Sequence, residues 1–256
     1  MIAISFNRVP EHRPQSGSLS LLASGTMIRV LQTSDEKRII ENAKVVQRRM
    51  RDRCGCGRGE TMLEIRYIGG MDAFYTPGEI GIGVVAVFTF PELEVVEHSV
   101  AIRYARFPYI PGLFAFREVP LCLAACEKLS TWPDLLLVNG HGYAHPERFG
   151  IACHAGALLA VPTIGVASRP LSGHSGHLDS KQGSIAPLLD GEEQIGMAVR
   201  TRESSRPVYV SAGYRTTLPF AVKVTLGTAR DHRMPHPIHS ADILARKIGR
   251  NFVSQG

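Results

Sequence analysis

Polar side chains follow two short apolar runs in the middle of the chain, Leu135 to Val138 and Thr163 to Val166, and a helical pattern separates the runs. A strand, helix, strand unit crosses over in the right-handed sense, so the two strands are parallel and their carboxyl ends meet at one edge of the sheet. Open α/β sheets bind their ligands just beyond those ends. The amide, imidazole, hydroxyl and guanidinium groups found there are predicted to form the site. They belong to Asn139, His141, His145, Ser168 and Arg169.

Three further residues have a chemical and a structural interpretation. Asp72 stands in the middle of a predicted strand, where it faces solvent or, if it faces the core, must be paired, hydrated or bound to metal. Glu118 precedes Pro120, which suits a first helical turn, so this acid either complements the helix dipole or reaches into a site. Tyr109 lies between two prolines, where an aromatic ring either packs or inserts between stacked bases. Position alone leaves these alternatives open.

The order of the predicted elements indicates the fold. Residues 64–106 alternate with a period of two and are divided by TPGE and FPE, which predicts three antiparallel strands. Such a meander, followed by helix, strand, helix and strand, is the order of the ribonuclease H-like architecture. We therefore expect an α/β fold whose mixed central sheet has three antiparallel strands and then parallel strands, flanked by helices. A basic hairpin with Arg200, Arg202 and Arg206 follows, and two helices close the chain, with Ser240 capping the second.

The flanking segments predict less structure. Residues 1–33 show no sustained period, so we expect a poorly ordered extension before a single domain over residues 34–256. Ser34 is predicted to cap a basic helix that ends at CGCG, residues 54–57. The two cysteines there lack a second pair at a metal-finger spacing, so a flexible loop is favoured. The stretch after Pro170, with His174 and His177, is also predicted to be a loop.

Composition narrows the setting. A formal charge of +6 and a pI near 9.2 favour an acidic partner such as nucleic acid, although many basic proteins bind none. Five scattered cysteines do not form a disulfide framework, which predicts a reducing, cytoplasmic location. No apolar run reaches the roughly 20 residues of a membrane span, and the first residues lack a signal-peptide pattern. We expect a soluble, cytoplasmic monomer that has no contact with a membrane.

Four segments in succession, FPYIPGLFAFRE, PDLLLVNGHGYAHPERFGIACH, VPTIGVASRPLSG and VYVSAGYRTTLPFAV, resemble the motifs of endonuclease V, and the similarity extends over residues 38–250. The resemblance implies a ribonuclease H-like fold, a Mg²⁺ or Mn²⁺ cofactor, and cleavage of DNA or RNA one nucleotide beyond the 3′ side of an inosine. It implies that Asp72 and Glu118 bind metal and that Tyr109 lies on a wedge loop that separates the strands. The residues it places against nucleic acid are Tyr109, Pro111, Gly112, His141, Gly142, His145 and Arg169.

Three catalytic positions depart from the family motifs. Asn139 stands where VDGHG has aspartate, Ser168 where GVAK has lysine, and Tyr214 where GHR has histidine. Mg²⁺ usually takes one or two carboxylates with water and substrate phosphate, so Asp72 and Glu118 meet that minimum, with Asn139 a neutral third ligand. Serine lacks the charge that stabilises a transition state, and the tyrosine pKa near 10 makes it a poor substitute for histidine. Arg169 is next to Ser168, but neighbouring side chains in an extended segment point to opposite faces.

Two hypotheses follow from these departures. In the first, the protein is a metal-dependent endonuclease of inosine-containing DNA or RNA whose activity is impaired, because each lost group lowers the rate by about 10²-fold or more. In the second, it is a catalytically inactive pseudoenzyme of the same fold that binds nucleic acid. A fully active enzyme that tolerates the replacements, with Mn²⁺ for example, is the remaining alternative.

Overall fold

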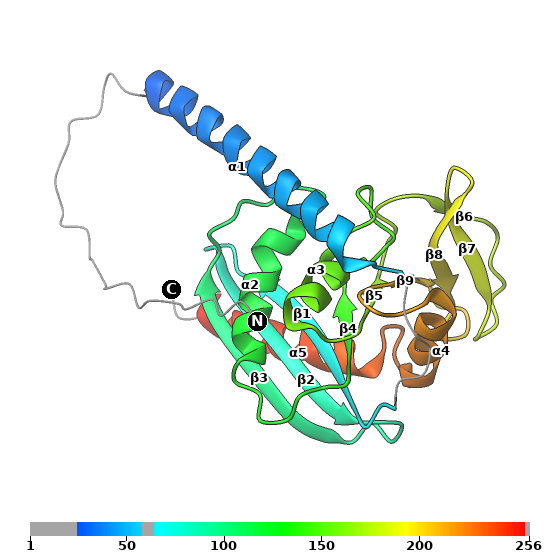
Figure 1. The fold of residues 1–256 in the computed structure, drawn as a ribbon. Helices are drawn as coiled ribbons and strands as arrows, with labels where there is room; N and C mark the ends of the chain where they lie inside the picture. Colours follow the sequence, from blue (N-terminus) through cyan, green and yellow to red (C-terminus); the bar gives the residue numbers. More distant parts are fainter. Residues whose placement is uncertain (1–24, 58–63, 254–256) are drawn as a thin grey trace. The chain divides into compact units, whose positions relative to one another are not determined.

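A nine-stranded mixed sheet forms the centre of the protein (Figure 1). The computed structural model describes residues 25–57 and 64–253. The chain divides into two units, residues 1–41 and 42–256, and helix α1 (Gly25–Cys54) begins in the first unit and ends in the second. The strands lie in the order β3-β2-β1-β4-β5-β9-β8-β7-β6. None of the helices in the described part of the chain combines the length and the hydropathy that a membrane span requires.

The first three strands form the predicted antiparallel meander. They are β1 (Tyr67–Tyr75), β2 (Ile80–Thr89) and β3 (Val95–Tyr104), and β1 pairs with β2 while β2 pairs with β3. Helix α5 (His236–Val253) packs directly on β1, where Gly70 permits the contact: a Cβ atom at this position would lie 2.0 Å from the backbone of Pro237. The close approach of α5 brings its polar residues to the strand that carries Asp72.

The parallel part of the sheet is also as predicted. Strands β4 (Leu135–Asn139) and β5 (Thr163–Ala167) are parallel, and helix α3 (Ile151–Leu159) connects them. β4 also pairs in parallel with β1, with Met71 opposite Val138. The next residues on the two strands, Asp72 and Asn139, therefore lie side by side at the same edge of the sheet. The expected α/β, ribonuclease H-like arrangement of a mixed sheet between helices is confirmed.

The last strands extend the sheet beyond β5. They are β6 (His174–Ser175), β7 (Ile185–Asp190), β8 (Glu193–Val199) and β9 (Val208–Ala212), all antiparallel to their neighbours. The hairpin of β8 and β9 was predicted. β6 lies in the stretch that was predicted to be a loop, and no strand was predicted where β7 forms. Helix α4 (Leu218–Thr228) follows β9.

Each face of the sheet is covered by a separate apolar core. On one face, α4 and α5 bury residues such as Ile238 and Ala241 against Ile68 and Leu137. On the other face, α2 (Phe114–Cys126) and α3 pack on Met71 and Leu136. Because odd and even strand positions alternate between the faces, Asp72 lies on the side of α5.

Three predicted helix boundaries are wrong. Helix α1 begins at Gly25, so Ser34 is an interior residue, and the predicted extension is helical from residue 25, with residues 1–24 outside the described part. Helix α2 begins at Phe114, after a turn in which Gly112 has φ +81°, so Pro120 lies inside the helix and Glu118 in its second turn. Helix α5 begins at His236 because Pro237 suits a first turn, which places Ser240 inside the helix.

Candidate active site

A cavity of about 720 Å³ opens at the carboxyl ends of β4 and β5, next to the start of α2. This volume accommodates a nucleoside, and it is within the range of ordinary ligand sites. Eight predicted residues line it: Tyr109, Gly112, Glu118, Asn139, His141, His145, Ser168 and Arg169. The loops that follow the parallel strands therefore meet the α2 segment, as the strand order predicts.

Asp72 lies buried beside this cavity, with only 7% of its surface exposed. Its Oδ1 accepts hydrogen bonds from Asn139 Nδ2 and from the backbone N–H of Ala73, both at 2.9 Å. Burial raises the pKa of Asp72 well above its usual range, and the nearby charge of Asp242 raises it further, while the two hydrogen bonds oppose the shift. The carboxylate is thus held in place by its neighbours while its negative charge is poorly compensated.

Glu118 is the second acid of the site. It extends from α2 and lines the cavity next to Asn139. Burial raises the pKa of Glu118 to about 7, against an opposing effect of the neighbouring Arg117. Arg117 itself is engaged elsewhere, since it pairs with Glu79 and donates to the carbonyl oxygen of Phe107 at 2.7 Å. Glu118 therefore lacks a dedicated cation among the described residues.

Asp242 is a third acid at the site, and the sequence analysis missed it. It lies on α5, and its charge raises the pKa of Asp72. Its Oδ1 accepts a hydrogen bond from Arg246 Nε at 2.6 Å, and Arg246 lines the cavity. Its only local signal is an acid beside the apolar positions Ala241 and Ala245, which shows that it is near the buried face but not which strand it meets.

The chemistry of these donors fits a hard divalent cation. Asp72 and Glu118 offer carboxylate oxygens, Asn139 keeps a carbonyl oxygen, and the raised pKa of each acid shows that a cation would relieve unfavourable burial. Within residues 25–57 and 64–253, no three His, Cys, Asp or Glu side chains converge closely enough to form a complete metal cage. The site therefore suits an ion that takes its remaining ligands from water and from the substrate.

The two histidines of the cavity are neutral at physiological pH. Burial lowers the pKa of both His141 and His145 to about 4. His141 Nε2 lies 3.0 Å from the carbonyl oxygen of Arg169 and must donate to it, which leaves the buried Nδ1 as an acceptor with no partner among the described residues. His145 Nδ1 accepts from the N–H of Glu147. Both rings therefore line the cavity without charge.

The loop that carries Tyr109 is fixed from behind by α1. Gln47 is 1% exposed, and its Nε2 donates to the carbonyl oxygens of Gly112 and Phe149, each at 3.1 Å. Tyr109 itself is 70% exposed, and its ring lies 4.7 Å from that of Phe114. A rigidly held loop with an exposed ring at its tip is suited to enter a nucleic-acid duplex.

Besides Asp72, which lies beside the cavity, three predicted residues do not line it. Pro111 is exposed on the loop beside it, and Gly142 is buried, with its N–H donating to Ser211 Oγ at 2.9 Å. Tyr214 lies at the amino end of β5, where its backbone pairs with Thr163, whereas Ser168 follows the carboxyl end of the same strand. The structure thus places Tyr214 at the end of β5 opposite the cavity.

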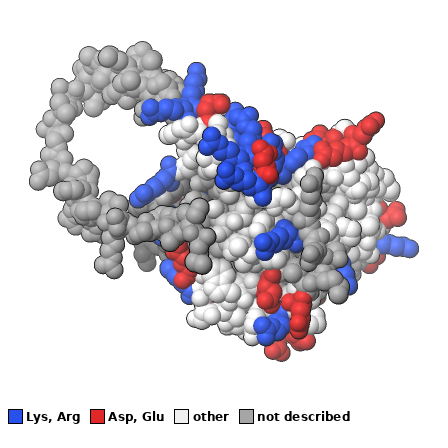
Figure 2. Space-filling view, viewed as in Figure 1, with Lys and Arg blue, Asp and Glu red and all other residues white. Residues whose placement is uncertain are grey.

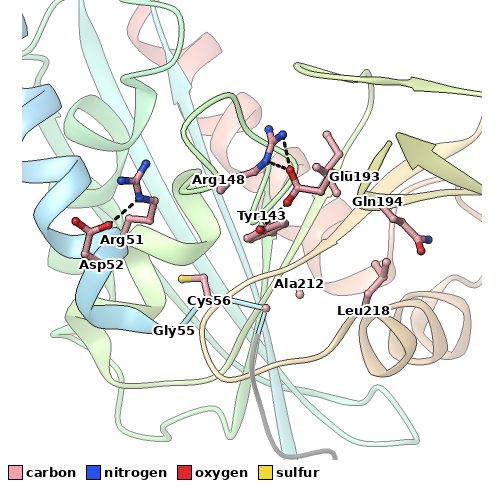
Figure 3. A pocket seen from close by; sticks show the side chains of 12 residues that line it. Arg51, Asp52, Gly55, Cys56, Tyr143, Arg148, Glu193, Gln194, Ala212 and Leu218 are labelled. Atoms are coloured by element: carbon pink, nitrogen blue, oxygen red, sulfur yellow. Dashed lines mark hydrogen bonds and ion pairs between the residues drawn. The ribbon is translucent and has the colours of Figure 1, made fainter. Parts of the chain in front are cut away.

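A second cavity lies where α1 ends, and its charged groups are mutually satisfied (Figure 3). Arg148 pairs with Glu193 at 2.7 Å and with Asp190 at 2.9 Å, and Tyr143 donates to Glu193 at 2.7 Å. The hydrogen bonds from Arg148 and Tyr143 lower the pKa of Glu193. Cys56 of the CGCG segment lies at the rim of this cavity (Figure 3).

Basic side chains gather over α1 on the face shown in Figure 2. The last part of this helix, after residue 41, carries Lys44, Arg48, Arg49, Arg51 and Arg53. The part of α1 that carries Gln47 is therefore rich in positive charge, which suits a partner that carries phosphates.

Comparison with known proteins decides the family. The model of the family described as endonuclease V matches residues 55–243, and an endonuclease V of Trichormus variabilis is 42% identical over 207 residues, covering 80% of this chain and 93% of the relative. The chain belongs to the endonuclease V family. The catalytic domain of human endonuclease V is 30% identical and superposes with a TM-score of 0.79, covering 86% of this chain and 99% of that one.

A further endonuclease V structure contains nucleic acid. The Ciona intestinalis protein, solved in complex with a 24mer DNA containing an inosine followed by a ribo-adenosine, is 25% identical with a TM-score of 0.70, and the match covers 84% of this chain and 99% of that chain. Membership of the endonuclease V family was predicted from the four motifs and is confirmed, and so is the fold.

Proposed function

We propose that this protein binds DNA or RNA that contains inosine and hydrolyses the phosphodiester bond one nucleotide beyond it on the 3′ side, with a divalent metal and at a low rate. The observation that carries the proposal is a pair of acids, the buried Asp72 and the half-buried Glu118, at a nucleoside-sized cavity that Tyr109 also lines. The inosine-containing DNA bound by the Ciona relative supports the choice of ligand.

The residues of the cavity have separate roles in the proposed reaction. Tyr109 separates the stacked bases, and the base that leaves the stack enters the cavity, where the neutral rings of His141 and His145 form part of the wall. Asp72 and Glu118, with the carbonyl of Asn139, would hold Mg²⁺ or Mn²⁺, which when bound supplies a Lewis acid for the phosphate and lowers the pKa of a bound water. Both acids must be ionised for this role, so a pKa of Glu118 near 7 favours activity above neutral pH.

Two features support a low rate. Asn139 contributes no charge, and its Nδ2 donates to Oδ1 of Asp72 and so competes with a metal ion for that oxygen. Ser168 is exposed at the cavity but offers a hydroxyl where a cation would stabilise the developing charge on the phosphate. Each of these losses corresponds to about 10²-fold in rate, although losses within one site are rarely additive.

The hydrogen bond from Asn139 to Asp72 also favours a second candidate function. If that bond persists when nucleic acid binds, it leaves metal only the Oδ2 atom of Asp72, and a protein that then fails to hold metal is an inosine-binding pseudoenzyme. The cavity and the Tyr109 loop are the same in both cases, so binding alone does not separate the two functions.

We further propose that the protein acts as a monomer in the cytoplasm. All five cysteines are free thiols, which suits a reducing compartment. Light scattering coupled to gel filtration would test the oligomeric state, and a mass near the 28.0 kDa of one chain is expected.

The test is cleavage of end-labelled DNA and RNA oligonucleotides that carry one inosine, in Mg²⁺ and separately in Mn²⁺, with binding followed by fluorescence anisotropy in EDTA. Asp72→Asn is the control, because it keeps the shape of the side chain and removes its charge. Cleavage beyond the inosine that the control abolishes would support the slow nuclease. Selective binding of inosine strands without cleavage would support the pseudoenzyme, and equal binding of inosine and unmodified strands would contradict both.

A further inference from the structure

A second groove adjoins the Tyr109 loop on the side away from the candidate active site. It lies between the end of β3 and the first turns of α2, and its walls include Tyr75, Arg103, Tyr104, Arg106, Phe107 and Phe116. We call it the β3 groove. Phe107 lines this groove and Tyr109, two residues later, lines the active-site cavity, so the loop Phe107–Tyr109 separates the two hollows.

Aromatic rings form much of the surface of the β3 groove. The rings of Phe107 and Phe116 lie 5.5 Å apart, and the Arg117 guanidinium covers the ring of Tyr75 at 4.2 Å. Tyr104 is different, because 73% of its surface is exposed, and no ring contact involving it exists among the described residues. An exposed tyrosine beside packed rings provides a flat surface on which a planar group can stack.

The groove also has free positive charge. Arg103 and Arg106 are both exposed, and neither side chain forms a hydrogen bond or an ion pair with any described residue. Arg117, by contrast, is paired with Glu79. The two unpaired guanidinium groups and the exposed tyrosine line the same groove, and together they match a strand that offers both phosphates and bases.

We propose that the β3 groove binds a single-stranded stretch of DNA or RNA next to the inosine, with phosphates on Arg103 and Arg106 and a base stacked on Tyr104. The inference rests on the proposed function, since the inosine in the neighbouring cavity places the strand. When Tyr109 enters the stack, the bases on its far side lose their neighbours, and the groove next to Phe107 receives them. An acidic peptide is the competing occupant, but it would not use the exposed ring of Tyr104.

Binding of fluorescent inosine-containing oligonucleotides, single-stranded and duplex, tests this proposal with anisotropy in EDTA over a range of salt concentrations. The charge variant is Arg103→Ala with Arg106→Ala, and its matched control is Lys223→Ala with Lys247→Ala, two exposed cations on α4 and α5. The charge variant should bind roughly 10-fold or more weakly at low salt, with a salt slope smaller by about 1.4–1.8, the value for two phosphate contacts.

The tyrosine variants separate stacking from charge. Tyr104→Ala should weaken binding by roughly 5- to 100-fold, while Tyr104→Phe, which keeps the ring, should bind like the parent. Parent-like binding and an unchanged salt slope in the charge variant would overturn the proposal. It would also be overturned if poly-glutamate displaced the labelled oligonucleotide more readily than unlabelled oligonucleotide does. A melting temperature equal to that of the parent would show that each variant is folded. A parent that does not prefer inosine refutes the proposed function instead, and the salt slope on unmodified single strands then still tests the groove.

Discussion

Replacing Asn139 with aspartate is expected to destabilise the metal-free protein and to strengthen its binding of divalent metal. Asn139 donates to Asp72 at 2.9 Å, and the change replaces this donor with a second negative charge beside an acid that burial already disfavours. Losing a hydrogen bond to a charged group costs about 1.5–3 kcal/mol, and repulsion between two partly buried charges adds a similar amount.

Sharing one proton between the two carboxyls limits this repulsion, so we expect the free energy of unfolding in EDTA at pH 8 to fall by about 2–4 kcal/mol. For a domain of this size the melting temperature should drop by roughly 5–15 °C. The loss should shrink as the pH is lowered, because a carboxyl whose pKa is raised in the folded state takes up its proton there first.

Metal should reverse the effect. The added carboxylate restores a full negative charge next to Asp72. We expect the affinity for Mn²⁺ or Mg²⁺ to rise on the order of 10- to 100-fold, which corresponds to only a fraction of the Coulomb energy of one further charged ligand. Millimolar Mn²⁺ should therefore raise the melting temperature of Asn139→Asp by more than that of the parent. Cleavage beyond inosine should rise by about 10²-fold, and further when Ser168→Lys is added.

The assay is thermal unfolding in EDTA and in Mn²⁺, with Asn139→Ala as the control, because alanine removes the same hydrogen bond without adding charge. The control should lose part of the stability and gain no response to metal. If Asn139→Asp melts with the parent in EDTA and shows no larger shift in Mn²⁺, then residue 139 does not act on Asp72 through charge, and the reasoning about the site is wrong.

Three more predictions use other contacts of the site. The pKa of Glu118 is raised to about 7 in the folded protein, so between pH 4.5 and 7 the folded state holds a proton that the unfolded state releases. The free energy of unfolding in EDTA should therefore fall as the pH rises through this range. In urea unfolding, the free energy of unfolding of Glu118→Gln should exceed that of the parent by roughly 1–3 kcal/mol at pH 8 and match it at pH 4.5. Gln47→Ala leaves the carbonyls of Gly112 and Phe149 without their donor and should lower the free energy of unfolding by about 2–4 kcal/mol, whereas the exposed neighbour Arg48→Ala should not change it in the same experiment. Tyr109→Ala should leave the melting temperature within about 2 °C of the parent but weaken the binding of inosine-containing duplexes by roughly 10-fold or more; equal affinities in anisotropy would show that this ring does not enter the stack.

Regular hydrophobic patterns in the sequence made much of the fold predictable. The meander β1–β3 follows a strict period of two, and the β4-α3-β5 unit is bounded by polar loops, so local sequence determines both. Helix ends were mispredicted where proline is compatible with two structures. Pro237 lies in the first turn of α5, but the two prolines of MPHPIHS are equally compatible with a linker. Strand β7 was missed because Pro187 is disfavoured within a sheet, and pairing with β8 compensates for it.

The site was predictable only where chain order fixes space. Parallel strands bring their following loops together, so Asn139, His141 and Ser168 could be placed beside one another from sequence. Tyr214 was grouped with them by its motif, but β9 runs antiparallel to β5, which puts the residue after β9 at the far end. No local rule states which way a late strand runs.

Asp242 and Asn139 have opposite effects on the buried carboxylate of Asp72. Both lie next to it, one on α5 and one at the end of β4, and the first adds negative charge while the second supplies a donor in place of charge. With aspartate at position 139, the site would hold four acids, counting Glu118 and Asp242, and Arg246 is paired with only one of them. Such a site would depend on metal for its stability, whereas asparagine lets it fold without metal and correspondingly weakens the attraction for the ion. The replacement at position 139 therefore changes folding and metal affinity in opposite directions.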